Sequence, residues 1–442
     1  MSAGDGRPIP AGRLQRMIAL GGLATGIGGR VLADGAMRLA QGERPRLSDL
    51  LLTPANALRV TDQLAHLRGA AMKVGQLLSM DAGDMLPAEM ALILSRLRAD
   101  ADPMPPQQLR QVLDQSWGVG WLSRFKRFDV HPIASASIGQ VHRALTKDGR
   151  DLAIKVQYPG IRASIDSDVD NVATLMRLSG LVPARLDLQP LLDEAKLQLH
   201  EEADYRREAT QMRRFGALLA GQPGFAVPVP QDDLSCGDVL AMDYLQSVPI
   251  ESIEAAPQAL RDDVALRMAG LALEELFDFN LMQTDPNFAN FRFAPDTGRI
   301  VLLDFGATRS FGTELAPRFK AVVEAGIAGE PGAMLTAMTE MGYLPPQLAE
   351  GHQRAILALA DLAFGPLRTG GVYDFASRDL AMQLRDRGMA LGMNRDLWHV
   401  PPPEVLFLHR KFGGLYLLLA RLRARVDLDP LIMRYFGSGN RA

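Results

Sequence analysis

The chain has 442 residues, of which 47% are hydrophobic and 22% charged, and this balance excludes disordered and fibrous proteins and predicts a sizeable core. A formal net charge of -3 without a long basic block argues against nucleic-acid binding. One cysteine cannot form an internal disulfide, and the seven histidines show no zinc-type spacing.

The first 50 residues are rich in glycine, alanine and arginine, which favours a flexible or membrane-interfacial segment. The apolar stretch Met17–Gly29 is shorter than the roughly 20 residues that span a bilayer. It also lacks the pattern of a secretory signal. We therefore expect a protein that stays inside a bacterial cell, in the cytoplasm or peripheral on the inner face of the cell membrane.

Helical periodicity predicts a helical extension over residues 51–126, with helices at Ala55–Met80 and Pro87–Arg98. Short β-branched runs from Phe128 to Val156, with a turn at Lys147–Arg150, then predict a small antiparallel sheet. This sheet would belong to a lobe over residues 127–245. The same lobe contains a helical stretch at 190–221 and a strand at 239–243.

Residues 246–442 are predicted to form a mostly helical lobe. A long helix is expected at 258–280, and a hairpin at 290–304 would turn at Asp296, Thr297 and Gly298. Beyond Thr313 the pattern predicts helices to the end. The expected fold class is therefore α+β.

The residues with the clearest chemistry follow the long helix. Asp285 and Asn290 are five residues apart, and Asp304-Phe305-Gly306 begins fourteen residues after Asn290. Phosphoryl transfer needs a carboxylate that orients or deprotonates the attacking oxygen, and ligands for the metal on the phosphates. We assign the first role to Asp285 and the second to Asn290 and Asp304. The predicted hairpin would return both ligands to one edge.

Lys155 lies in the short strand-like run Leu152–Val156, as does the lysine that binds the α- and β-phosphates in kinases. A solvent-facing strand lysine is the alternative. Kinases pair this lysine with a helix glutamate. Glu201, Glu202 and Glu208 are candidates, and the sequence alone does not choose among them.

The turn expected over the phosphates contains one glycine, where kinases have G-x-G-x-x-G. Alanine resists the positive φ values that glycine allows, so a stiffer loop is expected. An ordinary Ser/Ala turn is the alternative reading. The residues predicted to bind the nucleotide are Ala134, Ser135, Ala136, Ser137, Ile138, Gly139, Val141, Lys155, Asp243 and Leu245.

This alanine-rich loop resembles that of the UbiB, or aarF-domain, family of atypical kinases. The stretch Ala71–Gln76 matches the family's K-x-G-Q signature, and Glu202-Ala203-Asp204 its E-x-D motif. The resemblance implies a two-lobed protein-kinase-like fold in which the K-x-G-Q helix covers the active site. It also implies ATP or ADP with Mg²⁺ or Mn²⁺, and support of ubiquinone (coenzyme Q) biosynthesis. The catalytic residues it implies are Lys73, Gln76, Lys155, Glu202, Asp204, Glu208 and Asp285.

Glu202 and Asp204 are two residues apart and would diverge on a regular helix. Joint action at one site therefore requires a bend or a helix start between them.

Two features of protein-substrate kinases are absent, because Gln283-Thr284 replaces His-Arg before Asp285 and no Ala-Pro-Glu follows Asp304. We therefore favour ATP hydrolysis or phosphorylation of a small or lipid-like molecule. The alternatives are a phosphotransferase of the aminoglycoside or choline kinase type, and a nucleotide-switched pseudokinase scaffold or lipid chaperone. Expected partners are the nucleotide, ubiquinone precursors or other prenyl lipids, and other ubiquinone-biosynthesis proteins.

Apolar substrates suggest membrane contact. Val405–Val426 mixes apolar and basic residues, which suits an interfacial helix. The alternative is a core helix with a basic outer face.

Overall fold

The computed structural model describes residues 70, 103–178, 189–345, 349–377, 379–392 and 402–437. The chain divides into two compact units. Unit 1 comprises the residues up to Thr210 together with Val229–Tyr244, and unit 2 comprises Gln211–Pro228 together with the residues from Leu245 onward. The segment 1–50 and the helices predicted at 55–80 and 87–98 lie outside the described residues, apart from Ala70.

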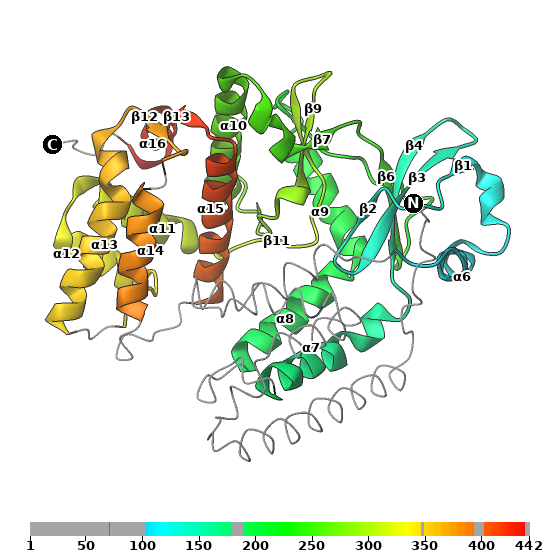
Figure 1. Cartoon of the computed structure of the whole chain (residues 1–442), viewed down its shortest axis with the longest axis horizontal. Coiled ribbons are helices and arrows are strands. Elements are labelled where there is room, and N and C mark those ends of the chain that lie inside the picture. The colour runs from blue at the N-terminus through cyan, green and yellow to red at the C-terminus, as the bar shows by residue number, and fades with distance from the viewer. Residues whose placement is uncertain are drawn as a thin grey trace, which may run out of the picture. The chain divides into compact units, whose positions relative to one another are not determined.

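Unit 1 contains the predicted antiparallel sheet (Figure 1). Its strands follow the order β1-β3-β4-β6, and β2 pairs with β3. The predicted turn joins β3 to β4, with Gly149 at a φ of +98°. The elements of the sheet are β1 (Phe125–Phe128), β2 (Ala134–Ser135), β3 (Gly139–Thr146), β4 (Asp151–Gln157) and β6 (Val239–Asp243).

The core of unit 1 lies between this sheet and the helix α6 (Pro106–Trp117), which is followed by the 3-10 turn η2 (Trp121–Arg124). Three aromatic rings, those of Trp117, Trp121 and Phe125, lie with centroids 5.4 to 6.0 Å apart. Aromatic pairs at such distances bury large apolar areas and add to packing. The sheet strand that carries Lys155 is therefore backed by a well-packed layer.

Helices α7 (Ile161–Leu178) and α8 (Gln189–Glu202) of unit 1 pack side by side (Figure 1). Helix α7 was not predicted, although its buried residues Ile165, Val169 and Val172 follow helical spacing. Helix α9 (Tyr205–Leu218) begins three residues after α8 ends. The predicted break between Glu202 and Asp204 is therefore confirmed.

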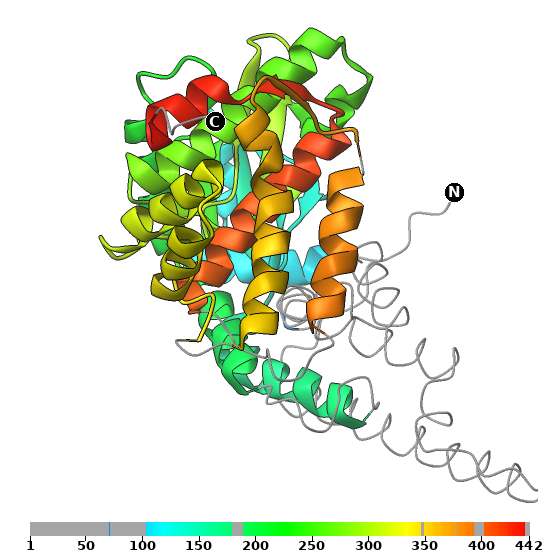
Figure 2. The same ribbon diagram turned by 90° about the vertical axis from the view of Figure 1, so that its left-hand side faces the viewer.

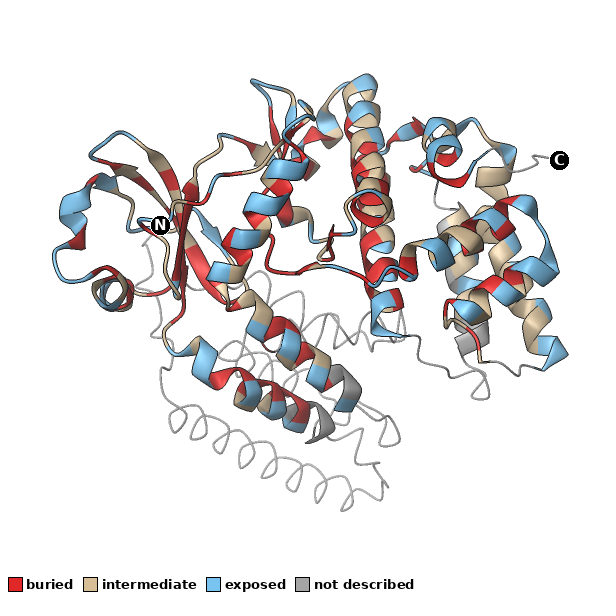
Figure 3. Cartoon of the chain, turned by 180° about the vertical axis from the view of Figure 1, so that it is seen from behind, coloured by how far each residue is buried: buried red, intermediate tan, exposed pale blue. Residues whose placement is uncertain are grey.

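Unit 2 is mostly helical, so the expected α+β class is confirmed. Its long helix α10 (Gln258–Phe277) buries Val264, Met268, Leu271 and Glu275, and buried and exposed residues lie on different sides (Figure 3). The predicted hairpin is present as β9 (Phe291–Ala294) paired antiparallel with β10 (Arg299–Leu302). The neighbouring elements are β5 (Phe225–Ala226), β7 (Val248–Pro249), η3 (Ile250–Ala255), β8 (Met282–Gln283), η4 (Phe288–Asn290) and β11 (Thr308–Arg309).

The end of the chain departs from the prediction of helices alone, because β12 (Val372–Asp374) pairs with β13 (Arg425–Asp427). Three-residue strands carry too little period-2 pattern to be read from sequence. Helices α13 and α14, gold and orange in Figure 2, run side by side. The helices here are α11 (Leu315–Ala328), α12 (Pro331–Glu340), α13 (Glu350–Thr369), α14 (Asp379–Gly392), α15 (Pro403–Arg421) and α16 (Asp429–Phe436).

Helix α15 contradicts the interfacial reading of Val405–Val426. Its apolar residues Phe407, Leu408 and Leu418 are buried in unit 2, so it is a core helix. The basic outer face expected for a core helix is also only partly present, since Arg410 and Lys411 are buried as well. Among the described residues, no helix combines the length and the apolar character that a membrane crossing requires.

Candidate active site

The candidate phosphate-binding lysine lies in strand β4 of unit 1, and its side chain is 9% exposed. Lys155 Nζ lies 2.9 Å from Glu208 Oε1 and 3.0 Å from Oε2, and Glu208 is fully buried. The Tyr205 ring lies 5.1 Å from the same ammonium. The structure therefore selects Glu208 among the three candidate glutamates and excludes a solvent-facing lysine.

The alanine-rich loop is the turn between β2 and β3. Ala136 N–H donates to the Gly139 carbonyl at 2.8 Å, and none of residues 134–141, all of which are described, has a positive φ. A Cβ on Gly139 would overlap the Val156 carbonyl oxygen of β4. The single glycine therefore permits a close approach between strands, while the rest of the loop needs no left-handed residue.

The E-x-D residues have different surroundings. Ser137 Oγ donates a hydrogen bond to Glu202 Oε2 at 2.7 Å, which ties the alanine-rich loop to the end of α8. Asp204 Oδ1 accepts from the backbone N–H groups of Arg206 and Arg207 at 3.1 and 3.0 Å. Asp204 therefore caps the start of α9, a structural role that aspartate commonly has at this position.

A buried network follows the loop in β3. Gln140 Oε1 accepts from Met104 N–H at 2.8 Å, and Gln140 Nε2 lies 2.8 Å from His142 Nε2. His142 Nδ1 lies 2.8 Å from the Asp129 carbonyl oxygen. These partners assign the neutral tautomer with the proton on Nδ1. Burial lowers the pKa of His142, opposed by its hydrogen bond to the Asp129 backbone.

The last predicted nucleotide-binding positions lie at the end of β6. Asp243 Oδ1 accepts from Gln231 Nε2 at 2.8 Å and is half-buried. The Leu245 carbonyl accepts from Ser247 Oγ at 2.9 Å. Asp243 belongs to unit 1 and Leu245 to unit 2, and their contact with a nucleotide stays a prediction.

The candidate catalytic loop of unit 2 starts at β8, which pairs antiparallel with β11 just after Asp304-Phe305-Gly306. Thr284 strengthens this pairing, because its N–H and its Oγ1 both donate to the Ala307 carbonyl, at 3.1 and 2.7 Å. The ladder joins the loop to the segment that follows Asp304. Thr284 and Ala307, 23 positions apart, are thereby held together.

Asp285 and Asn290 are in direct contact. Asn290 Nδ2 lies 3.2 Å from the Asp285 backbone oxygen and 3.3 Å from Asp285 Oδ2. The hairpin β9–β10 returns the chain, so that Leu303 N–H donates to the Asn290 carbonyl at 3.0 Å. Asp304 is the next residue, and its Oδ1 accepts from Gly306 N–H at 2.9 Å. The predicted metal ligands therefore lie at the same end of one hairpin.

The side chains at this end fit a magnesium site. Asn290 and Asp304 offer amide and carboxylate oxygens, which are hard ligands, and Mg²⁺ usually takes one or two carboxylates together with phosphate oxygens. Within the described ranges there is no cluster of three or more His, Cys, Asp or Glu side chains arranged for a metal.

Sequence reasoning missed two residues of α15 that contact the catalytic loop. Arg410 reaches Asp285, and Lys411 reaches the Gln283 carbonyl oxygen. The position of Lys411 in the sequence could have indicated this contact. Lys411 lies three residues after Leu408 and four before Leu415, and therefore on the apolar stripe of the helix. A charge on such a stripe indicates a buried partner.

The K-x-G-Q residues Lys73 and Gln76 lie outside the described residues. Their role stays a prediction from the resemblance.

Comparisons with known proteins agree with this reading. The model of the ABC1 atypical kinase-like domain matches residues 96–334. The Rattus norvegicus protein named atypical kinase COQ8B, mitochondrial, is 35% identical and covers 98% of this chain and 83% of its own length. The Saccharomyces cerevisiae atypical kinase COQ8, mitochondrial, is also 35% identical, over 97% of this chain and 85% of its own length.

A solved structure has a similar fold. It is the complex of Rv3197 with erythromycin from Mycobacterium tuberculosis, which is 26% identical in sequence and has a TM-score of 0.61. The match covers 87% of this chain and 96% of that chain.

The expected location in a bacterial cytoplasm, or on the inner face of a bacterial cell membrane, is wrong. The relatives from rat, S. cerevisiae and Caenorhabditis elegans are all named mitochondrial proteins. The composition of residues 1–50 did not distinguish between these compartments.

Proposed function

Because the chain belongs to the ABC1 atypical kinase-like family, we propose that it is an ATP-dependent phosphotransferase or ATPase that supports ubiquinone (coenzyme Q) biosynthesis. The family makes nucleotide binding the expected starting point. The pathway follows from the resemblance to the UbiB family and from the COQ8 relatives.

The observation that carries the proposal is the arrangement of the loop 285–290 with Asp304. Asp285 is held by Asn290, and the β9–β10 hairpin brings Asn290 next to the residue before Asp304. Phosphoryl transfer demands mainly positioning and charge stabilisation, and these side chains supply both. We assign to Asp285 the orientation of the attacking oxygen.

In unit 1, Lys155 would bind phosphate oxygens, and Glu208 would hold its ammonium in place. A buried lysine is costly without a carboxylate, and Glu208 supplies one at 2.9 Å. The loop 134–141 would contact the nucleotide, and Ser137 would fix its tip through Glu202. Lys73 and Gln76 would act with this group as the resemblance implies.

Asn290 and Asp304 would hold Mg²⁺. When bound, the ion supplies positive charge that neutralises the phosphate oxygens during transfer. The protein's part is to keep both ligands at one end of the hairpin, with Asp304 oriented by the N–H of Gly306.

The acceptor of the phosphate is water or a small, lipid-like molecule rather than a protein. The absence of Ala-Pro-Glu after Asp304 removes a feature of peptide-substrate kinases.

The test is magnesium-dependent ATP turnover by the purified chain, with and without liposomes that contain a ubiquinone-precursor mimic. We expect Asp304→Asn and Asp285→Asn to lower turnover at least about 10²-fold, as loss of one charge-stabilising group does. The matched control is Asp296→Asn, the same substitution at the exposed turn of the same hairpin.

Turnover that is lost in both site variants and kept in the control supports the proposal. Nucleotide binding without turnover under every condition would instead favour a scaffold that uses the nucleotide as a switch. Turnover unchanged in Asp304→Asn would exclude the assigned site.

A further inference from the structure

Helix α15 contacts the catalytic loop through consecutive residues, although more than 120 positions separate them in sequence. Arg410 Nη2 donates to Asp285 Oδ1 at 2.7 Å, and the two side chains are 6% and 17% exposed. Asp285 Oδ2 receives the contact from Asn290 at 3.3 Å. The carboxylate is therefore held at both oxygens, by a cation on one side and an amide on the other.

The neighbouring Lys411 fixes the main chain at the start of the loop. Its Nζ donates to the Gln283 carbonyl at 2.9 Å and lies 2.5 Å from Glu275 Oε2 of α10. Burial raises the pKa of the Glu275 carboxyl, and the lysine opposes this rise. The Lys411 ammonium thereby joins α15 to α10 and β8, two neighbouring elements that lie more than 120 positions earlier in the chain.

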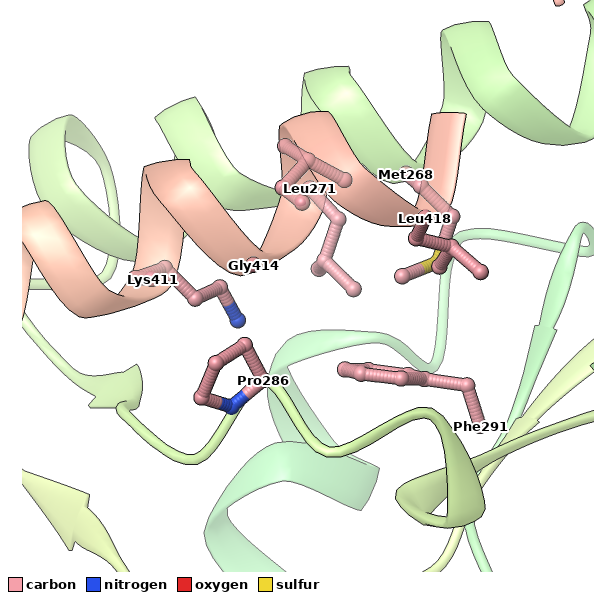
Figure 4. Close-up of a pocket in the computed structure, with 8 residues that line it drawn as sticks. Met268, Leu271, Pro286, Phe291, Lys411, Gly414 and Leu418 are labelled. Atoms are coloured by element: carbon pink, nitrogen blue, oxygen red, sulfur yellow. The ribbon is translucent and has the colours of Figure 1, made fainter. Parts of the chain in front are cut away.

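The loop also packs directly on the surface of α15. Pro286 lies against Gly414, where any Cβ would overlap the Pro286 ring carbons. Figure 4 shows Pro286 under the helix at this point, with the Lys411 side chain extending toward the loop. Phe291 lies in the same small apolar pocket as Leu418. The loop is thus fixed by shape as well as by charge.

Stability alone explains this arrangement poorly. A buried ion pair often contributes no more to the free energy of unfolding than apolar side chains of similar volume, because both charges lose hydration. An apolar core at this place would need no arginine. An Arg–carboxylate contact does, however, fix the orientation of the carboxylate, since the guanidinium is planar and its donors are rigid.

We propose that Arg410 is a positioning residue for phosphoryl transfer: it fixes the orientation of the Asp285 carboxylate, while Lys411 and Gly414 fix the backbone that carries it. This inference rests on the proposed function, in which Asp285 orients the attacking oxygen. In this role Arg410 acts through Asp285. Its loss should therefore affect the chemical step rather than nucleotide binding.

The experiment measures kcat and KM for ATP, together with the urea midpoint, in the full chain and in Arg410→Met, Arg410→Lys and Asp285→Asn. For Arg410→Met we expect kcat to fall about 10- to 100-fold, as for a misplaced catalytic group, with KM within about twofold of the parent value. Arg410→Lys keeps the positive charge but loses the planar guanidinium, so its kcat should lie between those of Arg410→Met and the parent. Arg421→Met is the matched control, because it removes an exposed ion pair of the same helix.

Adding Arg410→Met to Asp285→Asn should lower turnover no further than Asp285→Asn alone, because the two residues act as a unit. Independent, multiplying losses would contradict the inference. If Arg410→Met does not fold, Arg410→Lys carries the same test, and a kcat unchanged from the parent would overturn the inference.

The two proposals fail differently. Loss of turnover in Asp285→Asn together with full kcat in the folded Arg410 variants would sink the inference alone. Full turnover in Asp285→Asn would sink the proposed function and, with it, the positioning role.

Discussion

The part of the chain that the structure describes contains two buried lysine–glutamate pairs, one in each unit, with similar burial. Lys155 and Glu208 are 9% and 0% exposed, and Lys411 and Glu275 are 5% and 2% exposed. The first pair was anticipated from a motif, whereas the second was not. Burial and charge therefore do not by themselves separate a phosphate-binding lysine from one that supports the fold.

The surroundings of the two ammonium groups differ. Lys155 contacts both oxygens of one carboxylate and the ring of Tyr205, and it projects from a strand next to the alanine-rich loop. Lys411 connects a carboxylate on one helix to the backbone carbonyl of Gln283. The first lysine holds a side-chain carboxylate, whereas the second also holds a main-chain carbonyl. We expect ligand chemistry from the first and loop positioning from the second.

The largest expected effect is on stability at the second pair. Lys411→Met should lower the free energy of unfolding by about 3–5 kcal/mol, because it leaves the buried Glu275 carboxylate without its cation. Urea denaturation measures this loss. The double variant Lys411→Met/Glu275→Met should recover most of the stability and keep turnover within about tenfold of the parent, since one tie to the loop is missing.

The double variant of the first pair should differ from that of the second pair in its ATP turnover. Lys155→Met/Glu208→Met should also fold, because both charges are removed together. Its ATP turnover should nevertheless stay about 10²- to 10³-fold below the parent, equivalent to about 2.7–4 kcal/mol of transition-state stabilisation. Steady-state kinetics on both double variants measures the contrast. Equal turnover in the two would erase the distinction drawn between the pairs.

A smaller effect is expected where α15 packs on the loop. Gly414→Ala should destabilise the protein by about 1–3 kcal/mol, because the added methyl overlaps Pro286 and forces a backbone shift. Gly413→Ala is the matched control, since its Cβ would meet no atom within 4 Å. Thermal melting compares the two variants. Equal melting temperatures would show that the loop moves to accommodate the methyl group without a loss of stability.

The smallest effect concerns pH. The folded pKa of His142 lies below the ordinary value of 6.5, so on acidification the unfolded chain binds a proton before the folded chain does. Stability is therefore fully present above about pH 6.5 and falls as the pH drops toward the folded pKa, by at most about 1.4 kcal/mol per pH unit. The interaction with His131 also lowers the pKa of His142, whereas the interaction with Asp129 raises it.

Urea midpoints between pH 7.5 and 5.5 measure this loss of stability. In His142→Gln the urea midpoint should fall less steeply as the pH is lowered. Burial also lowers the pKa of His409, which stacks on Tyr343, so His409→Gln separates the second contribution. If the urea midpoint depends on pH in both variants as it does in the parent, the two histidines are not the source of the pH dependence.

Local residue patterns were sufficient to predict much of this protein. The turn residues Asp296, Thr297 and Gly298 predicted a hairpin over 290–304 that returns two ligands to one end, and β9–β10 has that geometry. A two-residue offset predicted the break between Glu202 and Asp204, because a helix cannot present both on one face. These inferences succeeded because they depend on the geometry of a few neighbouring residues.

The tertiary structure decided the rest. The choice of Glu208 and the contacts of Arg410 and Lys411 depend on residues brought together from distant parts of the chain. The sequence of α15 was compatible with a membrane surface as well as with a core, because both settings require one apolar face. Which partner covers that face, and which carboxylate meets each cation, is fixed only when the whole chain packs.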